Sequence, residues 1–129
     1  MKAKPYIQGD LVLAVDFDGT ITTSPDMGHE MYPQPDAIRV IEKLHMDGVR
    51  LQLWTCRTGK ALEEAKSFLE DHCVLHCFET INDHLPEIVL MYKEPARKLG
   101  ADFYIDDKNL GTTINWREIE TFIYGEVLE

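Results

Sequence analysis

Positive charge is scarce in this chain of 129 residues. Lys and Arg together number 13 against 23 Asp and Glu, so the formal net charge at pH 7 is −10. Nucleic-acid backbones and anionic lipid surfaces are recruited by clustered Lys and Arg. The acid excess therefore argues against an extended nucleic-acid or membrane interface, while it leaves room for a local site that binds one phosphate.

The chain also lacks long apolar runs, and its number of cysteines is odd. The longest apolar run near the start covers residues 11–15, far short of the ~20 residues of a membrane-spanning helix. Residues 1–4 resemble the basic start of a signal peptide, but no apolar segment follows them. Three cysteines without a secretory signal predict reduced thiols. We expect a cytoplasmic protein without a membrane partner.

The chain carries no internal repeat and no low-complexity block. At this length one core can bury roughly two-thirds of the surface of the unfolded chain, so neither a metal nor a disulfide is needed merely to keep it folded. We therefore expect a single domain over residues 1–129.

Apolar runs that stop at polar residues alternate with segments of helical periodicity. Strands are predicted near residues 11–15, 49–54, 78–81 and 101–105, and helices near 36–47, 59–69, 86–99 and 114–123. Alternation of this kind predicts a fold of the α/β class, a three-layer α/β/α sandwich with a mainly parallel central sheet. Ligands of such folds bind at the carboxyl ends of the strands.

Polar side chains follow three of the predicted strands. Asp16 and Asp18 come after the first, Thr55 after the second, and Asp106 and Asp107 after the last. Like charges gathered at one sheet edge repel unless a cation lies among them, and hard oxygen ligands suit Mg²⁺. The sequence therefore predicts that four carboxylates converge on a magnesium site.

The spacing of the first two acids fits phosphoryl chemistry. Asp16 and Asp18 lie two residues apart, so in an extended chain both side chains point to the same side. Gly19 and Thr20 then allow a sharp turn. One carboxylate can attack phosphorus, while the other protonates the departing oxygen and later activates water.

Residues 16–20, Asp-Phe-Asp-Gly-Thr, resemble the first motif of the haloacid dehalogenase (HAD) superfamily. The other motifs follow in order: Thr55 at the end of its strand resembles the second, Lys98 the third, and the acidic pair that ends in Asp107 the fourth. The resemblance spans about residues 11–111. It implies a HAD-like, Rossmannoid hydrolase that requires Mg²⁺.

The resemblance also implies roles for the acids. Asp16 would be the nucleophile that forms an aspartyl-phosphate, and Asp18 the general acid/base, whose backbone carbonyl also contacts Mg²⁺. Asp106 and Asp107 would complete the metal shell. Ion-pumping members of the superfamily carry Thr at the position of Asp18, so an acid there favours hydrolysis, and we expect a phosphomonoesterase.

Several residues are expected to hold the phosphoryl group. Thr55 and Lys98 would neutralise and orient its oxygens. Lys93 is an alternative to Lys98, because a helix could carry it into the site. Arg57 opens the second helix, whose N-terminal amides favour an anion. The remaining candidates are in the first motif: Asp16, Gly19 and Thr20.

The spacing between the motifs leaves no room for a large cap domain. Residues 18–55 contain the predicted loop, one helix and one strand. Residues 55–98 contain two predicted helices and one strand. The loop at residues 21–33, which carries Met27, His29, Met31 and Tyr32, is the local candidate for a flap. In the superfamily that the motifs resemble, an open site of this type goes with bulky phosphorylated substrates, or with a partner subunit, such as a second copy of the chain, as a lid.

Three other interpretations of the sequence are considered against the motifs: a signalling domain, an idle interaction domain and a zinc site. A signalling receiver domain is also acidic, α/β and dependent on Mg²⁺, but its acid pair comes first in the chain, whereas here it comes last. A catalytically idle interaction domain would keep the metal site. Zinc at residues 72–77, His-Cys-Val-Leu-His-Cys, fits no common ligand spacing, so solvated histidines and buried thiols are expected there, and Cys56 is expected to serve packing.

Overall fold

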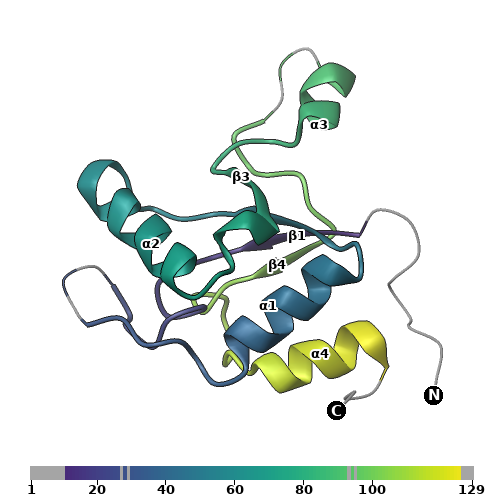
Figure 1. Ribbon diagram of the computed structural model, residues 1–129. Helices are drawn as coiled ribbons and strands as arrows, with labels where there is room; N and C mark the ends of the chain where they lie inside the picture. The colour runs from purple at the N-terminus through teal and green to yellow at the C-terminus, as the bar shows by residue number, and fades with distance from the viewer. Residues whose placement is uncertain (1–10, 27, 29, 93, 95, 126–129) are drawn as a thin grey trace.

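The protein folds into strands and helices that alternate along the chain (Figure 1). The structure, a computed structural model, describes residues 11–26, 28, 30–92, 94 and 96–125. None of the helices in these ranges has the length and apolar content needed to cross a membrane. The elements are, in order, β1 (Val12–Val15), α1 (Ala37–Met46), β2 (Arg50–Leu53), α2 (Gly59–Asp71), the 3₁₀ helix η1 (Leu75–Cys77), β3 (Phe78–Ile81), α3 (Pro86–Met91), β4 (Phe103–Ile105) and α4 (Trp116–Tyr124).

The four strands form one sheet in the order β3-β2-β1-β4, and every neighbouring pair is parallel. Val15 at the end of β1 pairs with Leu53 in β2 and with Ile105 in β4. The carboxyl ends of these three strands are therefore level, with β1 between the other two. Each strand forms close to its expected position, and all neighbouring pairs are parallel. The predicted α/β class and parallel sheet are therefore confirmed.

The main core lies on the sheet face that carries Leu13, Val15, Leu51 and Leu53, all at most 1% exposed. Side chains turned to one face of a strand recur every second residue, which these positions satisfy. α1, α2 and α4 contribute their apolar stripes to the same core, because their apolar residues recur three or four positions apart. These residues are Val40, Ile41, Leu44, Ala65, Phe68, Leu69, Trp116, Ile123 and Tyr124.

The opposite sheet face is covered differently. Gln52 of β2 is fully buried there and donates a hydrogen bond of 3.0 Å to the carbonyl of Gly100. α3 ends at Met91, so the helix expected to reach residue 99 is shorter than predicted, and none of its residues is buried. Figure 1 shows α3 standing away from the sheet. The parallel sheet is thus established, while a complete third layer stays a prediction.

One buried carboxylate joins α1 to α4. Glu120 is fully buried and accepts hydrogen bonds from Arg39 (2.8 Å) and Lys43 (2.6 Å) of α1. Burial acts to raise the pKa of Glu120, but the bonds from the two cations outweigh it, so the pKa is lowered. This carboxylate is held ionised by its partners.

Candidate active site

Three carboxylates gather where β1 and β4 end. Asp16 follows β1, and Asp106 and Asp107 follow β4. One carboxylate oxygen from each lies within 4.8 Å of the others. The pairing of β1 with β4 causes this, because the backbone N–H of Asp16 donates to the carbonyl of Ile105 at 2.9 Å. The predicted convergence of these three acids is confirmed.

Thr20 links the two sides of the cluster. Its hydroxyl lies 3.2 Å from the carboxylate of Asp16 and 3.3 Å from that of Asp107, and it accepts a hydrogen bond of 3.0 Å from the backbone N–H of Asp107. The buried indole N–H of Trp116 donates to the Thr20 carbonyl at 2.9 Å. Thr20 therefore positions the acids, with its own backbone fixed from the core.

Gly19 permits the close approach of Asp107. Its φ is +73°, in the left-handed region that favours glycine. A Cβ atom at this position would lie only 2.1 Å from a carboxylate oxygen of Asp107. Both the backbone conformation and the missing side chain are therefore required for the compact cluster.

The surroundings of Asp16 disturb its ionisation. Burial, the hydrogen bond with Asp107 and the negative charge of Asp106 together raise the pKa of Asp16 to about 7. Among the described residues, no Lys or Arg forms an ion pair with any of the three acids. At neutral pH, the cluster therefore holds negative charge that no ion pair within the described ranges balances.

Asp18 does not join this cluster, which corrects the expectation of four convergent carboxylates. Its two oxygens accept hydrogen bonds of 2.9 and 2.8 Å from the guanidinium of Arg57. Arg57 was expected to offer its charge to a phosphate, but its side chain is 2% exposed and lies over the Phe17 ring. Arg57 therefore positions Asp18 and does not face solvent.

Thr55 lies at the end of β2, as predicted, and Asn82 fixes its backbone. The side-chain oxygen of Asn82 accepts a hydrogen bond of 2.8 Å from the N–H of Thr55. The Thr55 hydroxyl accepts a bond of 3.1 Å from the N–H of Arg57. Sequence reasoning missed Asn82, although it directly follows β3 and the strand-end rule that found the acids would have found it.

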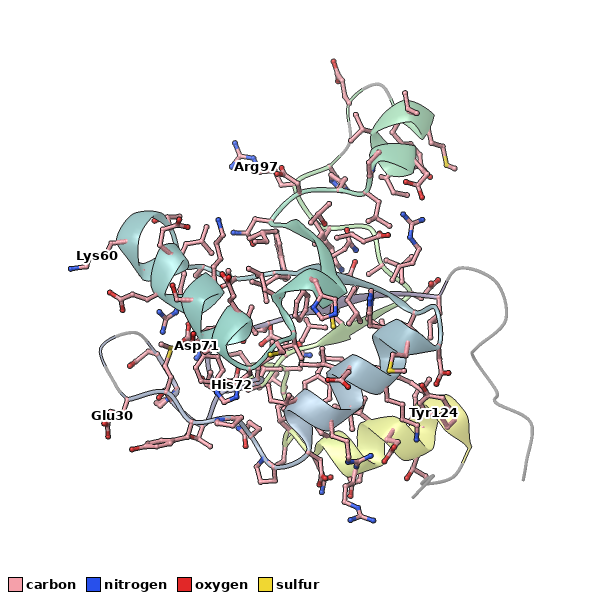
Figure 2. All side chains as sticks on the ribbon, in the orientation of Figure 1. Glu30, Lys60, Asp71, His72, Arg97 and Tyr124 are labelled. Carbon is pink, nitrogen blue, oxygen red and sulfur yellow. The ribbon has the colours of Figure 1, made fainter. Side chains whose placement is uncertain are left out.

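Lys98 is exposed, and its ammonium lies 4.9 Å from the centre of the Tyr104 ring. It lines a cavity of about 410 Å³ together with Trp54 and Asp106, so a cation and a metal-site carboxylate border the same space. The neighbouring Arg97 points away from the domain (Figure 2). The alternative, Lys93, lies outside the described residues.

The loop between β1 and α1 contains neither helix nor strand in its described part, as predicted. Thr22 and Pro33 form an isolated antiparallel bridge at its base, and Thr23 donates to the carbonyl of Tyr32 at 2.8 Å. The sulfur of Met31 lies 3.8 Å from the Arg57 guanidinium. Two residues of the expected flap, Met27 and His29, lie outside the described part.

The cysteines differ from the packing role expected for them. Cys56 and Cys73 are exposed, and only Cys77 is buried. Cys56 is therefore not a core residue, although it sits next to the candidate site. The described backbone leaves it at the surface because it lies in the turn between β2 and α2.

The donors of the cluster fit a magnesium ion. All are carboxylate oxygens, the ligand type that Mg²⁺ prefers, and in the part of the chain that the structure describes they converge without an ion-paired Lys or Arg. A divalent cation among them would favour the ionised form of Asp16. Asp16, Asp106 and Asp107 are the side chains that can hold it.

These observations define an α/β protein with an acidic site at the carboxyl edge of a parallel sheet. Comparison with protein-family models and with curated proteins gave no match. A solved structure, described as that of a conserved protein coded by a locus of Bacteroides thetaiotaomicron, is 32% identical, with a TM-score of 0.74. The match covers 89% of this chain and 90% of the Bacteroides chain. This chain belongs to the same family as that conserved protein.

Proposed function

We propose that the protein is a Mg²⁺-dependent, HAD-like phosphomonoester hydrolase. The observation that carries this proposal is the cluster of Asp16, Asp106 and Asp107, whose uncompensated charge calls for a divalent cation at the strand ends. The motif order of the HAD superfamily supports it as well, since Thr55 and Lys98 follow in the expected sequence.

Asp16 is the proposed nucleophile. Its carboxylate oxygen attacks the phosphorus, the ester P–O bond breaks, and an aspartyl-phosphate forms. Water then attacks the same phosphorus and displaces Asp16, which releases inorganic phosphate. When bound, Mg²⁺ would neutralise negative charge on the phosphoryl oxygens. Thr20 supports the attack by holding Asp16 beside Asp107.

Asp18 is the proposed general acid/base, and Arg57 controls where its carboxylate points. Both oxygens of Asp18 are occupied by the guanidinium. Each oxygen keeps a further lone pair, so Asp18 can also bond to the leaving oxygen of the substrate while Arg57 holds it. Arg57 acts in this scheme as a positioning residue, because it touches Asp18 and not the phosphoryl group.

Thr55 and Lys98 are proposed to orient the phosphoryl oxygens. Thr55 is held by Asn82 at the end of β2, and Lys98 enters from the segment before β4. In this proposal no large cap covers the site, which would stay open to a bulky phosphorylated substrate. A second copy of the chain is one partner that could close it.

The proposal is tested by phosphate release from a panel of phosphomonoesters, with Mg²⁺ at neutral pH. Asp16→Asn is expected to lower turnover about 1,000-fold or more, because it removes the nucleophile. Asp71→Asn is the matched control: this exposed acid ends α2 and is not part of the acidic cluster, so the activity of the variant is expected to equal that of the wild type.

Three results would contradict the proposal. Near wild-type turnover in Asp16→Asn would exclude the covalent mechanism. Mg²⁺ binding without release from any substrate would favour an idle interaction domain. A phosphorylated Asp16 that persists would instead indicate a signalling domain, whereas a hydrolase turns it over.

A further inference from the structure

Two histidines and a cysteine meet at the end of the sheet opposite the acidic site. His45 lies in the last turn of α1, which leads into β2, and His76 and Cys77 belong to η1, which leads directly into β3. The three side chains therefore lie near the amino ends of β2 and β3. The acidic cluster lies at the carboxyl ends, so the two groups are separate.

The three side chains are close enough to share one ion. A donor atom from each lies within 4.8 Å of the others. Cys77 Sγ lies 3.8 Å from His76 Nε2, and the rings of His45 and His76 are in edge contact with centroids 5.1 Å apart. Zn–N and Zn–S bonds of ~2.0 and ~2.3 Å at a tetrahedral angle place nitrogen and sulfur about 3.6 Å apart. Small movements of the imidazole rings would bring the donor atoms to these distances.

The donor types select the metal. Imidazole nitrogen and thiolate sulfur suit Zn²⁺, whereas Mg²⁺ prefers oxygen. Burial and the nearby charge of Glu42 raise the pKa of Cys77 to about 11, so a metal has to displace the thiol proton as it binds. The same negative charge then attracts the cation. Glu42 lies three residues before His45 on α1, on the same side of the helix.

We propose that His45, His76 and Cys77 form a Zn²⁺ site that ties the end of α1 to η1. Glu42, whose charge acts on Cys77, adds negative potential near the site. This site is independent of the proposed phosphatase activity, since it shares no residue with the acidic cluster.

The set of ligands differs from the cysteine and histidine run visible in the sequence. His72, labelled in Figure 2, packs against the Phe68 ring with centroids 4.5 Å apart. Cys73 is exposed and is not part of the cluster. The tertiary fold replaces both with His45, which lies on another helix. His72 is therefore the matched control for the two histidine ligands, and Cys73 can be replaced without removing a ligand.

The experiment is a Zn²⁺ titration of the full chain against a chromophoric chelator, with Mg²⁺ in excess to occupy the acidic cluster. A background with Cys56→Ser and Cys73→Ser leaves Cys77 as the remaining thiol of the three in the chain. Within it, His45→Gln, His76→Gln and Cys77→Ala are compared with His72→Gln. Co²⁺ serves as a second probe, because a cobalt–thiolate bond gives a charge-transfer absorption band.

One Zn²⁺ per chain is expected, with affinity lowered about tenfold or more by His45→Gln and by His76→Gln, and unchanged by His72→Gln. The Co²⁺ band should disappear in Cys77→Ala. Absence of binding in the background protein, or equal affinity in His45→Gln and His72→Gln, would overturn the proposal. The histidine variants decide the outcome even if Cys77→Ala fails to fold, since His45 and His76 lie at the surface.

Discussion

The pKa values of two carboxyl groups in this protein, Glu120 and Asp16, are shifted in opposite directions. Glu120 is fully buried between α1 and α4, yet its pKa is lowered, because Arg39 and Lys43 donate hydrogen bonds to it. Asp16 is less buried, yet its pKa is raised to about 7, because its neighbours are the acids Asp106 and Asp107. Burial alone therefore does not decide the ionisation of a carboxyl group in this fold.

The difference separates a structural acid from a candidate functional one. A buried carboxylate that only supports packing is stable when cations satisfy it. Three acids held together without a cation of the described chain cost folding free energy at neutral pH, and a bound divalent ion offsets that cost. The strained site is the one at the strand ends, where ligands of parallel α/β folds bind.

The largest expected effect contrasts Glu120→Gln with Asp106→Asn. Glu120→Gln should lower the free energy of unfolding by about 1–3 kcal/mol, because it weakens charge-assisted bonds to Arg39 and Lys43. Asp106→Asn should raise the stability of the metal-free protein, because it removes a repelling charge beside Asp16. Urea denaturation without metal measures both values. Equal destabilisation by the two variants would contradict the comparison.

A smaller effect is expected from Gly19→Ala. The left-handed backbone costs an L side chain about 1–2 kcal/mol, and the new Cβ would push the Asp107 carboxylate aside. Gly111→Ala is the matched control, because Gly111 has a φ of +77° but nothing within 4 Å of its Cβ position. Both variants should lose stability in urea, while only Gly19→Ala should also weaken Mg²⁺ binding measured by calorimetry. Identical Mg²⁺ affinities would exclude the steric role of Gly19.

The smallest effect is a pH dependence of the metal-free protein. The pKa of Asp16 is raised from 3.8 to about 7 on folding, so its contribution to stability is fully present below about pH 4 and is lost as the pH rises toward 7. Mg²⁺ should therefore raise the melting temperature more at pH 8 than at pH 5. Thermal scans at both pH values measure this, and Asp16→Asn should remove most of the difference. A larger Mg²⁺ effect at pH 5 would refute the assignment.

Much of the fold follows from local patterns. Short apolar runs that end at Asp16, Thr55 and Asp106 predict buried parallel strands, and each strand forms there. The helix expected to reach residue 99 ends at Met91, because the segment that follows has neither the apolar stripe nor the spacing to continue it. Strand-end reasoning also brought Asp16, Asp106 and Asp107 together correctly.

Other features of the site depended on contacts between distant residues. The sequence placed Asp18 with the other acids and Arg57 with the phosphate, because both follow strands that end at the same edge. The structure pairs them with each other across 39 positions of the chain. The position of Thr20 between Asp16 and Asp107 is likewise a contact that no local pattern contains.

The sequence by itself determined the class of fold and which residue types follow the strands, because apolar periodicity and the residues at strand ends are local properties. The tertiary structure alone decided which charges meet. It left Asp16 among acids, gave Asp18 and Glu120 their cations, and brought His45 to Cys77, since charges interact through space and the distances between side chains are set only when the helices pack on the sheet.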